Sequence, residues 1–330
     1  MPHIPSTRRG LIAGAAFLAA EAVPAAAQVP AGPAVSNTIR ANAGTVGIIS
    51  GGVDGTYIRI AADLAAVLDD GDTLRVLPVV GKGSLQNFSD IIYLRGIDAG
   101  IVQSDVLAYV LREGLFPGTS RAIQYVAKLY DEEVHILARE GITRVEDLAG
   151  QKVNVDVRGS GTAMTATVIF KSLGIAIQPT NDLQEVALRK LRSGEIAALL
   201  YVTGKPARMF AALEANAGLH FLPLPLNGPL LDTYLPAALT HAEYPALVPD
   251  GAPVETAAVG AVMAVFGWMP GSERHRKVAR FVAALQDKFT SLQQPPRHPK
   301  WREVNLAAEV PGWTRFNMQE PAAPRPRYWR

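Results

Sequence analysis

Short runs of hydrophobic residues alternate with segments of helical periodicity along most of the chain. The run at 45–50 ends in glycines, and the hydrophobic positions between Thr56 and Leu68 then repeat with helical spacing. The same pattern predicts strands at 73–80, 98–103, 151–157, 196–202 and 256–266, and helices at 84–96, 104–114, 162–173, 184–195, 205–216 and 272–293. Extended segments are predicted at 123–130, 134–138 and 220–226. This alternation is typical of parallel sheets covered by helices on both faces.

The alternation runs through two cycles and predicts an α/β protein with two similar lobes. Lobe 1 is placed at 44–128 plus about 227–292, lobe 2 at 129–226, and a Pro-, Trp- and Arg-rich C-terminal extension at 293–330. Ligands bind beyond the carboxyl ends of strands in such sheets, so facing lobes would form a cleft. We expect the extension not to be needed for ligand binding, and Trp301 and Trp313 to pack it against one lobe.

The first 27 residues are typical of a signal peptide. Arg8 and Arg9 precede a short apolar run, and the alanines at 25–27 predict cleavage after Ala27. The arginine pair weakly resembles a twin-arginine signal, so the Sec and Tat routes both stay open. Residues 28–43 are predicted to be a flexible leader. An exported chain with no later membrane span is expected in the periplasm, and not to span the membrane itself.

The amino-acid composition excludes several classes of function. The formal net charge is +2, which gives no electrostatic case for nucleic-acid binding. The absence of cysteine excludes thiol catalysis and cysteine-based metal sites. The six histidines lack metal-ligand spacing, and no nucleophile has an evident base. We therefore expect no enzyme activity, no catalytic residue, no metal and no cofactor. Asp131, Glu132 and Glu133 are expected on a solvated crossover, and His135 at a strand start near the hinge.

Five of the predicted strands end in small polar residues, and most of these ends lead into a helix. They lie at 50–52, 81–84, 103–104, 159–162 and 203–204. A helix start offers free backbone N–H groups and the positive end of the helix dipole, which suits an anion. Several such ends around one cleft favour binding over catalysis.

The chain resembles the TAXI family, the solute-binding subunits of tripartite ATP-independent periplasmic (TRAP) transporters. The resemblance runs from about Gly44 to about Leu292 and rests on segments present in the family's order. They are GGVDGTY (51–57), GKGSLQN (81–87), DAGIVQSD (98–105), KLYDEEVHILAR (128–139), RGSGTAM (158–164) and LLYVTGKP (199–206). It implies a type II periplasmic binding protein: two α/β lobes, a hinge and an interlobe cleft. It also implies a small carboxylate ligand, glutamate-like or a 2-oxo or 2-hydroxy dicarboxylate, and delivery to ion-gradient-driven TRAP membrane subunits, usually fused.

Mapped onto this chain, the motifs give a set of candidate ligand-binding residues. They are Ser50, Gly51, Thr56, Tyr57, Ser84, Asn87, Gln103, Ser104, Arg158, Ser160, Gly161, Thr162, Tyr201 and Thr203. Each hydroxyl has a second interpretation as a helix cap. Arg158 stands where the family often has proline, and it either clamps a carboxylate or covers a helix end.

Three other functions stay open. A receptor for an ATP-driven importer would be encoded beside an ATPase and a permease, whereas a TRAP receptor would be encoded beside a large fused membrane protein. A periplasmic enzyme on the same fold would need catalytic pairs, which this sequence lacks. A sensor module would act through a separate signalling protein.

Overall fold

The computed structural model describes residues 42–118, 122–215 and 218–319. The predicted signal peptide, its cleavage site, nearly all of the predicted leader and the end of the C-terminal extension lie outside these ranges. The strands are β1 (Thr45–Ile49), β2 (Arg75–Val79), β3 (Ala99–Gln103), β4 (Ile123–Arg139), β5 (Lys152–Asn154), β6 (Gln178–Thr180), β7 (Ala198–Thr203), β8 (Leu219–Phe221), β9 (Leu235–Leu239) and β10 (Val254–Phe266). The α-helices are α2 (Thr56–Leu68), α3 (Ser84–Tyr93), α4 (Val106–Arg112), α5 (Gly161–Leu173), α6 (Gln184–Arg192), α7 (Arg208–Ala211), α8 (Glu273–Asp287) and α9 (Phe289–Leu292).

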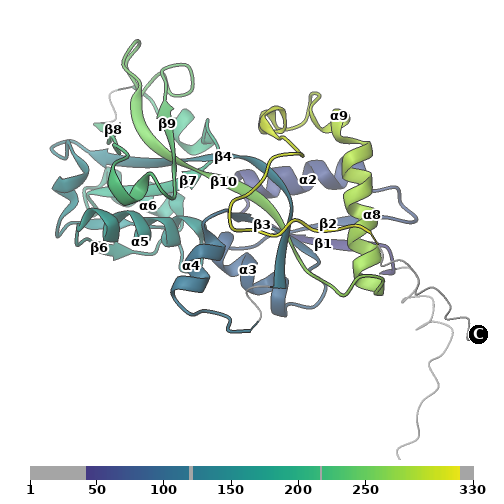
Figure 1. The fold of residues 1–330 in the computed structure, drawn as a ribbon. Helices are drawn as coiled ribbons and strands as arrows, with labels where there is room; N and C mark the ends of the chain where they lie inside the picture. The colour runs from purple at the N-terminus through teal and green to yellow at the C-terminus, as the bar shows by residue number, and fades with distance from the viewer. Residues whose placement is uncertain (1–41, 119–121, 216–217, 320–330) are drawn as a thin grey trace, which may run out of the picture. The chain divides into compact units, whose positions relative to one another are not determined.

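The described strands form one ten-stranded sheet in the order β2-β1-β3-β10-β4-β7-β5-β6, with β8 beside β4 and β9 beside β10 (Figure 1). Two blocks of the sheet are parallel: β2-β1-β3, the first block, and β7-β5-β6, the second block. The long strands β10 and β4 are antiparallel to each other and join the two blocks. The prediction of parallel strands is therefore confirmed within each block, whereas β10 and β4 pair antiparallel with their neighbours.

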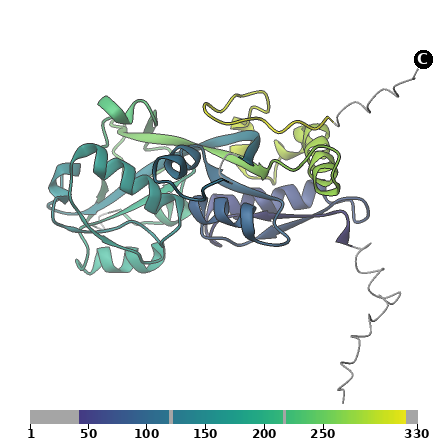
Figure 2. The same ribbon diagram turned by 60° about the horizontal axis from the view of Figure 1, so that its bottom comes forward.

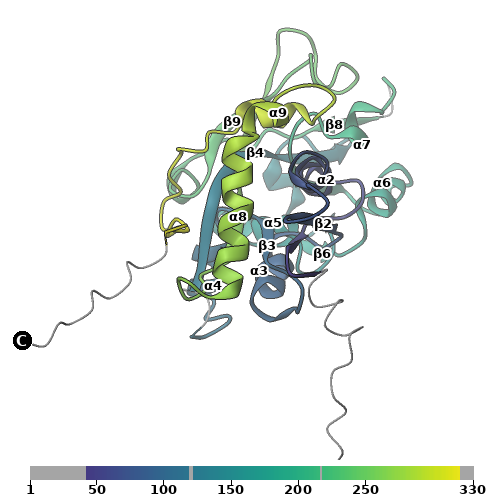
Figure 3. The same cartoon turned by 90° about the vertical axis from the view of Figure 1, so that its right-hand side faces the viewer.

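Helices cover both faces of each block. On the first block, α2 and α8 pack on one face, where Leu64 and Phe281 share a core (Figure 3). The other face is covered by α3 and α4, through residues such as Phe88. On the second block, α5 and α6 pack against β7, as the teal ribbons of Figure 2 show. Burial on both faces explains why the strands are so apolar in sequence.

Local sequence accounts for several element boundaries. Helix α2 begins and ends where its periodicity predicts, and it buries Tyr57, Ile60 and Leu64 on one stripe. Helix α5 begins after Ser160, whose hydroxyl accepts the Ala163 N–H, and it ends at a left-handed glycine, Gly174.

Two predicted helices differ most from the structure. Within 205–216, the helix α7 covers only Arg208–Ala211, and the Lys205 N–H before it bonds to Glu133. The predicted helix 272–293 is interrupted at Lys288 and forms α8 and α9.

The prediction of an acidic crossover is wrong. Residues 123–139 form a single strand, β4, and Glu132 and Glu133 are both buried within it. His135 lies in the strand interior rather than at its start, and its Nε2 is 2.7 Å from the Tyr244 hydroxyl. Burial lowers the pKa of His135 to about 4. Charge pattern alone does not reveal partners that arrive from distant parts of the chain.

The lobe boundaries stay predictions. Tyr234 packs with the α5 side of the second block, and Tyr244 packs with Phe210 and Phe221 on its other face. These contacts favour a lobe boundary later than residue 227, with the chain returning to the first block at β10.

Candidate ligand-binding site

A cavity of about 850 Å³ lies where the strand-end turns of the two blocks meet. Its wall comes from the starts of α2, α3 and α5, from the ends of β3 and β7, and from β4. The volume is within the usual range for sites that enclose a small molecule. Because several helices begin at the wall, α6 among them, free backbone N–H groups are concentrated there.

Most of the residues predicted from sequence line this cavity. They are Gly51, Thr56, Tyr57, Ser84, Gln103, Arg158, Ser160, Gly161, Thr162, Tyr201 and Thr203. The sequence could locate them because each follows a predicted strand, and strand ends within a parallel block meet at one edge.

Ser50, Asn87 and Ser104 were expected at the ligand but do not line the cavity. The Ser50 hydroxyl donates to the Val79 carbonyl at 2.7 Å, and Asn87 Nδ2 donates to the Ile101 carbonyl at 2.7 Å. The Ser104 backbone N–H donates to Gly260 at 2.7 Å. The Ser50 and Asn87 side chains therefore bond to β2 and β3, whereas the bond of Ser104 involves its backbone alone.

The Gly-Ser-Gly-Thr turn of the second block touches the first block directly. The Gln86 N–H donates to the Gly159 carbonyl at 2.9 Å. A Cβ atom at Gly161 would overlap the Gln103 side chain and would lie 2.6 Å from Ser84 Oγ. Opposite this turn, Gly83 has a φ of 106°, which a residue with a side chain rarely adopts. The two glycines thus permit the close approach of the two turns.

The hydroxyls of the turn already accept hydrogen bonds from the backbone. Ser160 Oγ accepts the Ala163 N–H at 3.1 Å as a helix cap, and Thr162 Oγ1 accepts the Val202 N–H at 3.1 Å. Thr162 keeps its hydroxyl hydrogen for donation to a ligand in the cavity, whereas the Ser160 hydroxyl also bonds to the Asp156 carboxyl group. A structural bond and a ligand contact are therefore compatible at Thr162.

Glu132 was not among the predicted site residues, yet it lines the cavity. The Tyr57 hydroxyl donates to Glu132 Oε2 at 2.7 Å and lies 3.4 Å from Ser84 Oγ. The residue is only 3% exposed, and burial raises the pKa of its carboxyl from 4.5 to about 8. The feature of the sequence that could have indicated a buried acid is the Asp-Glu-Glu triplet inside a hydrophobic run.

The raised pKa of Glu132 predicts how stability depends on pH. A carboxyl whose pKa is higher in the folded state stabilises the fold below its unfolded pKa, and this stabilisation is lost as the pH rises through about 8. We expect Glu132→Gln to gain stability relative to wild type between pH 5 and pH 8, by up to about 1.4 kcal/mol per pH unit. Urea unfolding of both proteins across this range measures the gain. A difference that does not change with pH would contradict it.

Basic side chains line the outer part of the cavity. Arg59, Lys82, Arg158 and Arg208 are all exposed and all belong to its wall. Arg158 also donates to Asn181 Oδ1 at 3.4 Å, so it stays at the rim. The exposed acids Asp54 and Glu185 lie on the same wall. A ligand would thus meet charges of both signs at the entrance.

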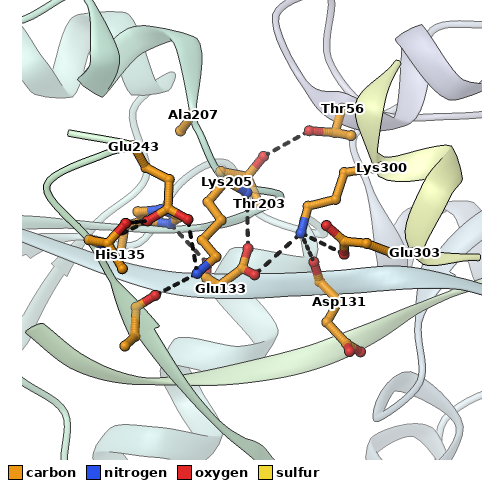
Figure 4. A network of polar contacts seen from close by, with 12 residues as sticks. Thr56, Asp131, Glu133, His135, Thr203, Lys205, Ala207, Glu243, Lys300 and Glu303 are labelled. Atoms are coloured by element: carbon orange, nitrogen blue, oxygen red, sulfur yellow. Dashed lines mark hydrogen bonds and ion pairs between the residues drawn. The ribbon is translucent and has the colours of Figure 1, made fainter. Parts of the chain in front are cut away.

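Glu133, the next residue of β4, belongs to a charged network instead of the cavity wall (Figure 4). Its Oε1 lies 3.3 Å from Lys300 Nζ, and its Oε2 accepts the Lys205 N–H at 2.9 Å. Lys300 also pairs with Glu303 at 2.9 Å and donates to the Asp131 carbonyl at 3.0 Å. The side chains of Lys300 and Glu133 are 3% and 5% exposed. This network links the C-terminal segment to β4 and to the loop after β7.

The C-terminal segment, which was expected not to be needed for ligand binding, contributes a residue to the cavity wall. His298 lines the cavity, and its backbone N–H donates to Asp63 of α2 at 2.7 Å. Trp301 and Trp313 pack on the two faces of the first block, which confirms that the tryptophans fix the segment to one part of the fold. The segment therefore forms part of the cavity wall.

Among the described residues, no helix is long and apolar enough to cross a bilayer. Within the same ranges, no three acidic or histidine side chains gather in a way that could hold a metal ion.

Comparison with known proteins identifies the family. Residues 48–270, more than half of the 330 residues, match the NMT1-like family, and the chain belongs to it. The solved structure of BugD, described as a periplasmic binding protein, shares 12% identity, with a TM-score of 0.50 over 79% of this chain and 88% of that chain. This likeness shows the fold, which is that of the type II periplasmic binding proteins.

Two other solved structures are similar at lower scores. A mutant of the arginine-binding protein ArgBP from T. maritima shares 14% identity, with a TM-score of 0.44 over 78% of this chain and 94% of that chain. A TctC solute-binding protein from Polaromonas shares 15% identity, with a TM-score of 0.40 over 75% of this chain and 88% of that chain.

Proposed function

We propose that the protein is a periplasmic receptor that binds a small organic carboxylate and delivers it to the membrane subunits of a transporter. The observation that carries the proposal is the cavity of about 850 Å³, at whose wall α2, α3 and α5 all begin. Free N–H groups there and basic side chains at the entrance favour a carboxylate. The wall offers no evident pair of nucleophile and base, so binding without turnover fits it better than catalysis.

The transporter is proposed to be of the TRAP type, with the receptor in the TAXI family. Support comes from the motifs that carry the resemblance, most of which lie on the cavity wall. Under this proposal an N-terminal signal exports the chain to the periplasm, and the ligand is a glutamate-like, 2-oxo or 2-hydroxy carboxylate. A receptor for an ATP-driven importer is the alternative, and the genes beside this one distinguish the two.

A ligand would hold the two blocks together, because both contribute polar groups to one cavity. Open and closed arrangements of such a receptor differ by a few kcal/mol, so contacts with the second block shift the balance. The contact between the turns at Gly161 and Ser84 belongs to the closed arrangement under this proposal.

The direct test is to identify what the protein binds. Mass spectrometry of small molecules released by denaturing the purified protein should find a carboxylate. A panel of mono- and dicarboxylates should then include members that raise the melting temperature. If no carboxylate is released and none stabilises the protein, the proposal fails.

Replacing both Ser160 and Thr162 with alanine should lower carboxylate affinity by roughly tenfold to a hundredfold, because the Thr162 hydroxyl no longer donates to a charged group and the turn loses its Ser160 cap. Stability should also fall, by about 1 kcal/mol for the cap and by about 1–3 kcal/mol for the buried Val202 N–H left without its acceptor. Calorimetric titration and urea unfolding measure the two effects. A folded double variant with unchanged affinity would place the ligand elsewhere.

A further inference from the structure

We propose that Glu132 is the subsite for a positively charged amine of the ligand, so that the receptor selects amino acids over 2-oxo and 2-hydroxy acids. The inference rests on the proposed function and names the ligand class of the same cavity. It starts from the carboxyl group of Glu132, a residue that is only 3% exposed and lies on the cavity wall. Among the described residues, this carboxyl group belongs to no ion pair.

The position of Glu132 is fixed from several sides. It lies in the middle of β4, whose neighbours in the sheet are β10 and β7. The Tyr57 hydroxyl holds its Oε2 at 2.7 Å, while Ser84 Oγ, near the same hydroxyl, accepts the Gln103 N–H at 2.9 Å. A carboxyl held in this way can receive a ligand group in one orientation.

The nearest cation is engaged elsewhere. Lys300 contacts Glu133 and Glu303, and it contributes to Glu132 only through its longer-range field. A buried carboxylate without a cationic partner is costly, and a cation supplied by the ligand removes that cost. The basic side chains at the entrance and the acid inside the wall thus provide opposite charges for the two ends of a zwitterion.

The competing interpretation is that Glu132 stays protonated and donates a hydrogen bond to a ligand carboxylate. The two interpretations differ in their response to Glu132→Gln. Glutamine keeps an oxygen for the Tyr57 hydroxyl and can still donate to a carboxylate, but it carries no charge for an ammonium group.

The experiment uses pairs of ligands that differ only in the amine. Suitable pairs are L-glutamate with 2-hydroxyglutarate, L-aspartate with malate, L-alanine with lactate, and L-leucine with 2-hydroxyisocaproate. In every pair that binds, calorimetric titration of wild type should show at least about tenfold tighter binding of the amino acid. Glu132→Gln should remove this preference by weakening the amino acid about 10- to 100-fold while leaving the hydroxy acid within about threefold.

A matched control is Glu255→Gln. Glu255 is exposed on β10 and does not line the cavity, so the same chemical change should leave both members of a pair within about twofold. This variant separates a local effect of Glu132 from a change in the net charge of the protein.

Proton release gives an independent readout. The charged and titratable groups that act on Glu132 are Tyr57, Glu133, Lys300, Asp105, Tyr130 and Tyr201. With its pKa raised to about 8, Glu132 is largely protonated at pH 7, and it must lose this proton to pair with an ammonium group. Amino-acid binding at pH 7 should therefore release a proton, seen as a binding enthalpy that varies with the ionisation enthalpy of the buffer. Glu132→Gln should abolish this variation.

The outcomes separate the inference from the proposed function. Equal or tighter binding of the hydroxy acid, or an amine preference that survives in Glu132→Gln, overturns the amine subsite and leaves a carboxylate receptor. If no amino acid and no hydroxy acid binds, the proposed function fails and the inference fails with it.

Discussion

Replacing Gly161 with valine should lower ligand affinity by about a hundredfold or more. A Cβ atom at this position overlaps the buried Gln103 side chain and lies 2.6 Å from Ser84 Oγ, and valine adds two methyl groups beyond it. Both neighbours are confined: the Ser84 hydroxyl accepts the Gln103 N–H at 2.9 Å, and the Gln103 side chain is 1% exposed, with its Oε1 3.5 Å from the Thr165 hydroxyl. The turns of the two blocks must then separate, and overpacking of this kind costs about 3 kcal/mol, or a factor of about 150 in affinity.

Gly52→Val is the matched control, because Gly52 lies on the same cavity wall and a Cβ there meets no atom within 4 Å. Calorimetric titration with a carboxylate that binds wild type should show near-normal affinity for this control. Small-angle scattering of Gly161→Val at saturating ligand should show a larger radius of gyration than wild type. A folded Gly161→Val protein with wild-type affinity would contradict the role given to the contact between the turns.

Replacing Lys300 with methionine should destabilise the protein by about 3–5 kcal/mol, the usual cost of leaving one member of a buried ion pair without its partner. Lys300 and Glu133 are 3% and 5% exposed, and Glu133 would keep only its bond from the Lys205 N–H. The negative charges of Glu133 and Glu303 raise the pKa of Lys300 above its ordinary value, although burial acts in the opposite direction. Lys300 is therefore charged at neutral pH, and its replacement removes the whole ion-pair contribution to stability.

A second substitution tests the cause. Lys300→Met combined with Glu133→Gln should recover much of the lost stability, because the unpaired charge is then absent. Lys190→Met is the control, since Lys190 is 29% exposed and its pairs with Asp182 and Glu195 should contribute at most about 1 kcal/mol. Urea unfolding of the four proteins measures these differences. A Lys300→Met variant as stable as the Lys190→Met control would show that the network in Figure 4 adds little to the fold.

The same network bears on the C-terminal segment. Truncation at Leu292 would remove Lys300 from Glu133, Trp301 from the core of the first block, and His298 from the cavity wall. Loss of stability and a change at the site would then occur together, so the single substitution at Lys300 is the cleaner measurement.

The sequence by itself determined what neighbouring residues control. The periodicity from Thr56 to Leu68 placed α2, and the glycines and the serine of the turn at 159–162 placed the start of α5. The order of the strand-end turns was enough to place most of the candidate residues on one cavity wall. Helical periodicity, caps and turns depend on residues a few positions apart, which a single sequence displays directly.

Only the tertiary structure decided which polar groups serve the cavity and which serve the scaffold. Glu132 and Tyr57 are 75 positions apart, and Lys300 and Glu133 are 167 apart, so no local pattern could pair them. Ser50 and Asn87 are polar like the cavity residues, but their side chains donate hydrogen bonds to carbonyl groups of β2 and β3. A buried ionisable group needs a partner, and in these two pairs the partner comes from a distant segment. The topology that joins β4, β10 and the C-terminal segment brings the two members of each pair together.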